Sequence, residues 1–273
     1  MTKRRVIRSL CFCALMLSLC VVLSAPAAAS STSVTQAADT ASSGGLLGAL
    51  MDTIAGGEVE GATDTIEIIL LITVLSLAPS ILVLMTAFTR IVIILSFTRN
   101  AIGTQQMPPN QVLVGLSLFL TFFVMFPVFS QIKEQAWDPY AAEEITFEEA
   151  ADLTIRPLND FMLTQIRLAG NESSLRTFMG LAQMEELPES IEDIPTYVII
   201  PAFVTSEIKV AFTIGFLIFI PFIVIDMVVA STLMSMGMMM LPPVMISLPF
   251  KIMLFLLVDG WNLTIGNIIK SFA

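Results

Sequence analysis

Residues 197–236 read YVIIPAFVTSEIKVAFTIGFLIFIPFIVIDMVVASTLMSM and contain three charged side chains, those of Glu207, Lys209 and Asp226. A membrane-spanning helix needs about 20 predominantly apolar residues, so this stretch is about twice as long as one span requires. Pro201 and Pro221 divide it, and an internal proline kinks or breaks a helix because it lacks the backbone donor. The stretch therefore predicts a long, broken helix in an all-α integral membrane protein.

The composition of the whole chain supports the same fold class. Of its 273 residues 56% are hydrophobic and 13% are charged, and the mean hydropathy is +0.87. Soluble domains carry about 25% charged residues, so a soluble enzyme is disfavoured. The sequence has no histidine, which removes the commonest general base and metal ligand. A net charge of −10 also argues against a nucleic-acid partner, which would require a basic face.

Toward the N-terminus, residues 66–130 predict a first pair of apolar helices. The segment 66–88 is almost uncharged, with Pro79 as a kink, and a second span covers 112–129. The loop between them, residues 90–110, contains Arg90 and Arg99 and no acid. The excess of positive charge places this loop in the cytoplasm, with both arginines as topology determinants.

The first 29 residues have the pattern of a cleaved secretory signal peptide. Basic residues at the start are followed by a short apolar run and a stretch of small residues that ends at Ala29. We expect the mature chain to begin at Ser30; a membrane anchor is the alternative, but the run is short for a span. All three cysteines lie within this segment. Residues 30–65, rich in Ser, Thr, Ala and Gly, predict a flexible extracytoplasmic linker.

Residues 131–195 differ in kind, because they hold fourteen acidic side chains and few basic ones. An acidic segment between spans predicts a small helical subdomain in the periplasm. Thr146 and Glu149 have the spacing of a capping box, which predicts a helix start. Pro157 predicts the start of a second helix, since proline suits the first helical position.

The C-terminal segment, residues 196–273, predicts a second apolar helical pair joined by a methionine-rich loop over 237–243. Gly237 precedes the methionines and the pair Pro242 and Pro243 follows them, and these residue types end and restart helices. The methionines are Met238, Met239 and Met240. Flexible apolar side chains from several copies would form a gasket against water and ions. The residues alone favour the alternative, which is ordinary packing of a methionine-rich hairpin.

Charged residues inside apolar segments are costly unless they are paired or face water. We therefore predict a contact between Glu207 and Lys251, within or between subunits; the alternative is that Glu207 and Lys209 both reach a polar interface. Asp226 is a further intramembrane charge, for a partner contact or a proton-accessible cavity.

Three long stretches carry a resemblance to a known family. Residues 88–129 (FTRIVIILSFTRNAIGTQQMPPNQVLVGLSLFLTFFVMFPVF), 201–216 (PAFVTSEIKVAFTIGF) and 220–261 (IPFIVIDMVVASTLMSMGMMMLPPVMISLPFKIMLFLLVDGW) resemble the FliP/SctR family of type III secretion export-gate proteins. The resemblance implies a gate subunit that forms a pentameric ring with FliQ and FliR and receives unfolded axial subunits from FlhA and FlhB. It also implies a place in the bacterial inner membrane at the flagellar basal body, and it favours a gasket of Met238–Met240 over ordinary packing.

Other functional classes remain as alternatives at this stage. The signal peptide favours the flagellar branch of the family over a virulence-type injectisome component. A polytopic secondary transporter would show repeat symmetry between its halves, and a scaffold would form no pore of its own. No phosphate-binding loop or buried catalytic base is recognisable, so we expect no enzyme activity, no catalytic residue, no cofactor and no bound metal.

Overall fold

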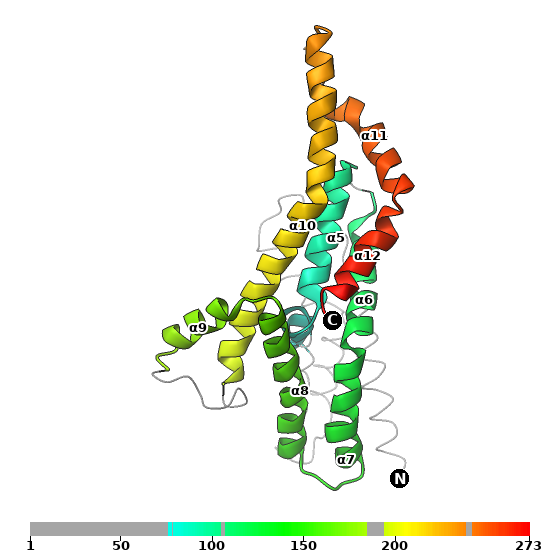
Figure 1. Cartoon of the computed structure of the whole chain (residues 1–273). Helices are drawn as coiled ribbons and strands as arrows, with labels where there is room; N and C mark the ends of the chain where they lie inside the picture. The colour runs from blue at the N-terminus through cyan, green and yellow to red at the C-terminus, as the bar shows by residue number, and fades with distance from the viewer. Residues whose placement is uncertain (1–75, 78, 105–106, 185–193, 239–241) are drawn as a thin grey trace, which may run out of the picture. The chain divides into compact units, whose positions relative to one another are not determined.

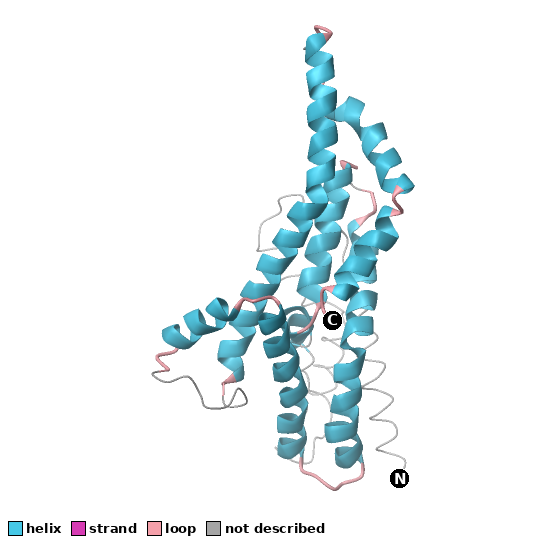
Figure 2. Cartoon of the chain, viewed as in Figure 1, coloured by secondary structure: helices cyan, strands magenta, loops and turns pink. Residues whose placement is uncertain are grey.

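The computed structural model describes residues 76–77, 79–104, 107–184, 194–238 and 242–273. The chain divides into two units, residues 1–79 and 80–273, and nearly all described residues belong to the second. Every element in the described part is a helix (Figure 2), which confirms the predicted all-α class. The predicted signal peptide and its Ala29–Ser30 cleavage site, the 30–65 linker and the start of the first apolar helix at residue 66 lie outside the described residues.

The longest of the described helices is α10, which runs without interruption from Thr196 to Ser235. At 1.5 Å per residue its 40 residues extend over about 60 Å. The sequence predicted breaks at Pro201 and Pro221, but both prolines lie inside the helix. Figure 1 shows that α10 changes direction near its middle instead of ending. An internal proline removes one backbone hydrogen bond, and the remaining bonds carry the helix through a bend.

Helix α5, Phe88–Ile102, is the main neighbour of α10. The two helices approach closely at Gly215, where an added Cβ would lie 2.6 Å from Cγ of Phe97. The Phe97 ring also meets Phe212 of α10 edge-on, with ring centroids 5.1 Å apart. The glycine therefore provides the space into which the Phe97 ring packs.

Helix α6, Asn110–Ile132, continues through a π-helical segment, η1 (Lys133–Trp137), into the short helix α7, Asp138–Ala141. Helix α8, Phe147–Leu168, then returns alongside η1 and α6 (Figure 1). The predicted capping box is confirmed, because the Thr146 hydroxyl accepts from the Glu149 N–H and the Glu149 carboxylate accepts from the Thr146 N–H. The predicted helix start at Pro157 is wrong, since this proline lies in the interior of α8.

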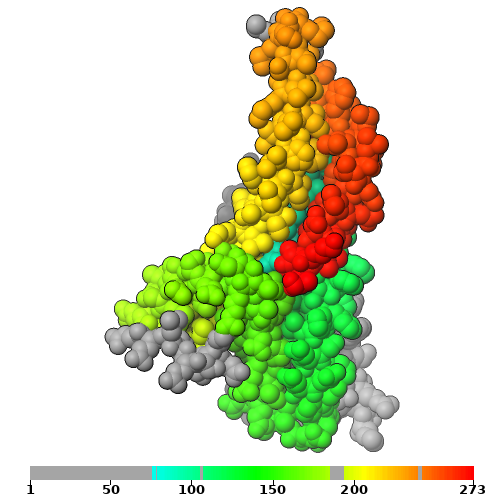
Figure 3. All heavy atoms as spheres, in the orientation of Figure 1, coloured from blue at the N-terminus to red at the C-terminus, as the bar shows by residue number. Residues whose placement is uncertain are grey.

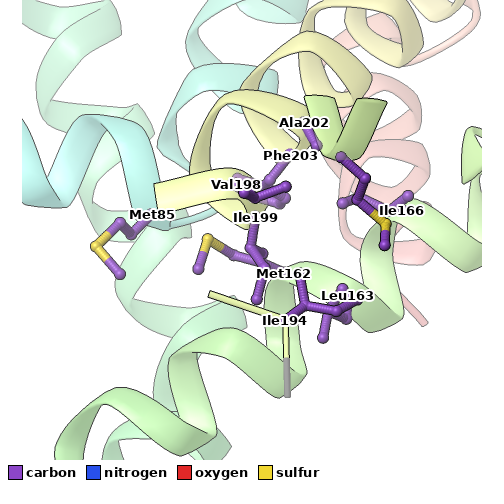
Figure 4. Packing of buried hydrophobic residues seen from close by; sticks show 10 residues of the cluster. Met85, Met162, Leu163, Ile166, Ile194, Val198, Ile199, Ala202 and Phe203 are labelled. Carbon is purple, nitrogen blue, oxygen red and sulfur yellow. The ribbon is translucent and has the colours of Figure 1, made fainter. Parts of the chain in front are cut away.

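The acidic segment packs on the first turns of α10. Figure 4 shows side chains of α8 and α10 pointing toward one another around Met162 and Phe203. Helix α9, Glu172–Leu181, adds Met179 to this cluster. A buried aliphatic or aromatic side chain stabilises the fold by about 1.5–3 kcal/mol. The other members of the cluster are Met85, Leu163, Ile166, Ile194, Val198, Ile199 and Ala202.

Helix α11, Pro243–Leu257, and helix α12, Gly260–Lys270, complete the chain and form a bent pair with an angle of 63° between them. Helix α11 packs along α10, as Figure 3 shows in orange beside gold. Asp259 lies between the two helices in the left-handed backbone conformation, with φ of 51°. The next residue is Gly260, and its lack of a side chain leaves room for the Phe255 ring, because an added Cβ would lie 2.2 Å from that ring.

Two described helical stretches are long and apolar enough to cross a membrane, Asn110–Ala141 and Thr196–Ser235. The number rises to four if each of two bent pairs counts as one span, Pro79–Met85 with Phe88–Ile102 and Pro243–Leu257 with Gly260–Lys270. The prediction of a helical membrane protein with long kinked helices is thus confirmed.

Candidate functional site

A buried ion pair lies at the centre of the helical unit. The Arg90 side chain of α5 is 1% exposed and the Glu207 side chain of α10 is fully buried. Arg90 Nε donates to Glu207 Oε2 at 2.8 Å, and Arg90 Nη2 donates to Glu207 Oε1. Two parallel hydrogen bonds between guanidinium and carboxylate give the pair a fixed geometry. The pair therefore fixes the register of α10 on α5.

The remaining donors of Arg90 reach two further segments. Nη1 donates to the Ser271 carbonyl at 2.7 Å, and Nη2 donates to Gln165 Oε1 of α8 at 3.2 Å. Gln165 Nε2 in turn donates to the Phe272 carbonyl at 3.1 Å. The Phe272 ring faces the guanidinium, with its centroid 4.0 Å from Cζ. One side chain thus connects α5, α8, α10 and the residues after α12.

The second charged contact connects α10 to α11. Lys251 Nζ donates to Asp226 Oδ2, and Ser247 Oγ donates to Asp226 Oδ1, both at 2.6 Å. The side chain of Lys251 is 5% exposed and that of Asp226 is 34% exposed. The pair lies where α11 returns along α10, so it fixes the position of the returning helix.

These contacts correct the predicted Glu207–Lys251 pair as a contact within one chain. Glu207 is already paired with Arg90, and Lys251 with Asp226. Glu207 and Asp226 are 19 residues apart on α10, which is about 28 Å along the helix, so each acid meets a different cation. The sequence predicted Arg90 only as a topology determinant in a loop, whereas its side chain is buried in the ion pair with Glu207.

Two further polar contacts involve residues that the sequence singled out. Lys209, exposed on α10, donates to Asn171 Oδ1 at 2.7 Å, and Asn171 Nδ2 donates to Ser206 Oγ at 2.9 Å. Arg99 donates from Nη1 to Asn110 Oδ1 at 2.6 Å. Arg99 therefore attaches the end of α5 to the first residue of α6.

The loop after α10 begins with a defined turn. Gly237 has φ of 75°, its N–H donates to the Met234 carbonyl, and the Met238 N–H donates to the Leu233 carbonyl. These two bonds form a Schellman motif, in which glycine takes the left-handed position without strain. On the other side, Pro242 caps α11 and Pro243 is its first residue. Met238 is 45% exposed; Met239 and Met240 lie outside the described residues.

Clusters of potential metal ligands are absent from the described part of the chain. Nowhere in 76–77, 79–104, 107–184, 194–238 and 242–273 do three or more Asp, Glu, His or Cys side chains gather closely enough to hold a metal ion. The buried charged groups are engaged with one another rather than aimed into a cavity. The arrangement serves to hold helices in register.

Fold and site together define a class: a helical membrane protein whose longest helix is fixed to its neighbours by ion pairs. The family model described as FliP family matches residues 71–268. The chain is 56% identical over 213 residues to "Flagellar biosynthetic protein FliP" of Bacillus subtilis, covering 78% of this chain and 94% of that protein. The chain belongs to the FliP family.

Other relatives with the same name are similar over comparable lengths. The chain is 51% identical over 210 residues to that of Pectobacterium carotovorum, covering 77% of this chain and 80% of the relative. It is 48% identical over 210 residues to that of Aquifex aeolicus, covering 77% and 86%. Both ion pairs and the loop between α10 and α11 lie within residues 71–268, the range that the family model matches.

Proposed function

We propose that the chain is a core subunit of the flagellar type III protein export gate and forms, with partners, the channel for unfolded axial subunits. The observation that carries this proposal is the family match across residues 71–268, which includes nearly all of the described helices. The relatives reported above all bear a flagellar name, which favours the flagellar branch over an injectisome.

The partners in this proposal are further copies of the chain in a pentameric ring, with FliQ, FliR, FlhA and FlhB, in the inner membrane at the basal body. Exposed apolar surface supports such an assembly. Helix α6 presents a row of phenylalanines, of which Phe119 is 72% exposed. Helix α10 presents Phe216 and Leu217, 61% and 60% exposed. Apolar surface of this extent in a single chain marks contact with lipid or with other subunits.

In this proposal the loop over 237–243 is the closed-state seal. Its supports are the Schellman turn at Gly237, which ends α10, and the proline start of α11; in the sequence the methionines come between these two helices. Methionine side chains are flexible and apolar, so they exclude water and still yield to a passing chain. The same proposal has the acidic segment 131–195 lie in the periplasm and contact neighbouring copies.

The test is replacement of Met238–Met240 by three alanines in the complete assembly. The shorter side chains widen the constriction, so small-ion leak across the membrane should rise while the ring still assembles. Replacement of the same residues by three leucines is the matched control, because it preserves apolar volume and should leak little. An alanine variant that assembles, exports axial subunits normally and leaks no more than the unmodified protein would show that the methionines are only packing.

A further inference from the structure

An open groove lies beside the start of α6. Its volume is about 440 Å³, and its walls come from the end of α5, the residues before α6, and helices α11 and α12. The lining is almost entirely apolar. Its main wall residues are Val112, Leu116, Ile252, Phe255, Leu256 and Trp261.

Arg99 lies beside this groove and has no carboxylate partner among the described residues. Arg99 Nη1 donates to the carbonyl of Pro108, a lining residue, at 3.4 Å, and to Asn110 Oδ1 at 2.6 Å. Both acceptors are uncharged, and the sequence from residue 79 to residue 133 contains no acid. Asp259, two residues before the lining residue Trp261, does not line the groove, and its carboxylate accepts from Asn262 Nδ2 at 2.7 Å. The half-buried guanidinium of Arg99 is thus available to an anion.

We propose that this groove holds one acyl chain of an anionic phospholipid whose phosphate pairs with Arg99. The helices around the groove belong to stretches with the length and apolar character of membrane spans, so a lipid chain matches their apolar surface. A guanidinium binds phosphate oxygens through two parallel hydrogen bonds. The groove supplies the apolar channel and Arg99 supplies the charge at its end, and a diacyl phospholipid with a negative headgroup needs both.

The dimensions favour a linear chain over a helix of a second copy. A helix is about 10 Å across with a pitch of 5.4 Å, so the groove volume of about 440 Å³ matches no more than a single turn. An acyl chain follows the long direction of an apolar groove without placing a polar backbone against it.

The experiment compares two lipids with identical acyl chains, phosphatidylglycerol and phosphatidylcholine. The full chain is reconstituted in an equal mixture of both, re-extracted in detergent, and the retained lipid is quantified by mass spectrometry. We expect roughly fivefold enrichment of phosphatidylglycerol, the size of effect that one basic residue gives near a membrane surface. Arg99→Gln should bring the ratio close to one, and Arg99→Lys should keep part of the preference.

A second variant tests the groove itself. Leu116→Trp fills the space with an indole ring, so the amount of phosphatidylglycerol retained should fall severalfold. Arg156→Gln is the matched control, because this exposed arginine lies on α8, away from the groove, and should leave retention unchanged.

Two results would overturn the proposal. One is an enrichment that neither Arg99→Gln nor Leu116→Trp changes, which would make the lipid nonspecific. The other is rapid disulfide linkage of two chains through Leu256→Cys in the equal lipid mixture, which would make the groove an interface between copies. Neither readout depends on protein export, so failure here leaves the proposed gate function untouched.

Discussion

Replacement of Glu207 by glutamine tests directly whether the buried ion pair holds α10 against α5. Glutamine has nearly the same shape but no charge, so the guanidinium of Arg90, 1% exposed, loses its only charged partner among the described contacts. Arginine stays protonated in proteins, so the charge cannot be relieved. Removing one member of a buried pair costs about 3–5 kcal/mol.

The lower end of that range applies here. Arg90 keeps the Ser271 carbonyl, Gln165 and the Phe272 ring, which solvate part of the charge. A loss of about 3 kcal/mol lowers the ratio of folded to unfolded protein roughly a hundredfold. For a unit of this size it lowers the unfolding midpoint by about 6–12 °C.

The assay is thermal unfolding of the detergent-purified chain, followed by loss of helical circular dichroism. Glu148→Gln is the matched control, since Glu148 is exposed on α8 and its charge has no buried partner. The double variant Arg90→Met with Glu207→Met should recover much of the loss, because it leaves no charge unpaired. Equal midpoints for Glu207→Gln and Glu148→Gln would refute the assigned role of the pair.

Three further predictions concern separate parts of the chain. Gly215→Ala places a methyl group against Phe97 and should destabilise the unit by about 1–3 kcal/mol in the same unfolding assay. Hydrogen bonds from Thr146 hold the pKa of Glu149 below its usual value, so this cap stabilises α8 above pH of about 4.5 and is lost as pH falls through the lowered pKa; acid titration of Thr146→Ala should lack that component. N-terminal sequencing of the membrane-extracted protein should begin at Ser30.

Each of these has its own check. Gly180→Ala is the control for the glycine variant, because nothing lies within 4 Å of an added Cβ there and the substitution should stabilise α9 slightly. An acid titration in which Thr146→Ala behaves like the unmodified chain would remove the role of the cap. A sequence that still begins at Met1 would contradict signal-peptide cleavage.

The elements that the sequence predicted well depend on local chemistry. The capping box at Thr146 involves residues three apart, and the turn at Gly237 depends on one residue with φ above zero. The prolines were harder to interpret, because Pro157 and Pro221 sit inside helices whose other backbone bonds and side-chain packing outweigh one missing donor. Local sequence shows that a proline is present but not how much packing supports the helix around it.

The ion pairs could not be assigned from spacing. Arg90 and Glu207 are 117 residues apart, and their contact depends on how α5 lies on α10. The sequence correctly identified Glu207 and Lys251 as charges that require partners, since a charge in an apolar helix is costly. It also offered Asp226 and Arg90, but nothing local distinguishes one cross-pairing from the other. A count of charges does not decide either, because α5, α10 and α11 together hold four cations and only two acids.

The charges on α10 also limit how this helix can sit in a bilayer. Between Lys209 and Asp226 it has 16 consecutive uncharged residues, 210–225, which cover about 24 Å. The hydrocarbon layer of a bilayer is about 30 Å thick. It is therefore several ångströms thicker than the uncharged stretch 210–225 is long when α10 stands upright. Any crossing therefore takes at least one charged side chain below the headgroups, or thins the membrane locally. If neighbouring protein shields one of the two ion pairs of α10 from lipid, that pair can lie inside the hydrocarbon layer. The choice of pair then sets the depth of α10 in the membrane.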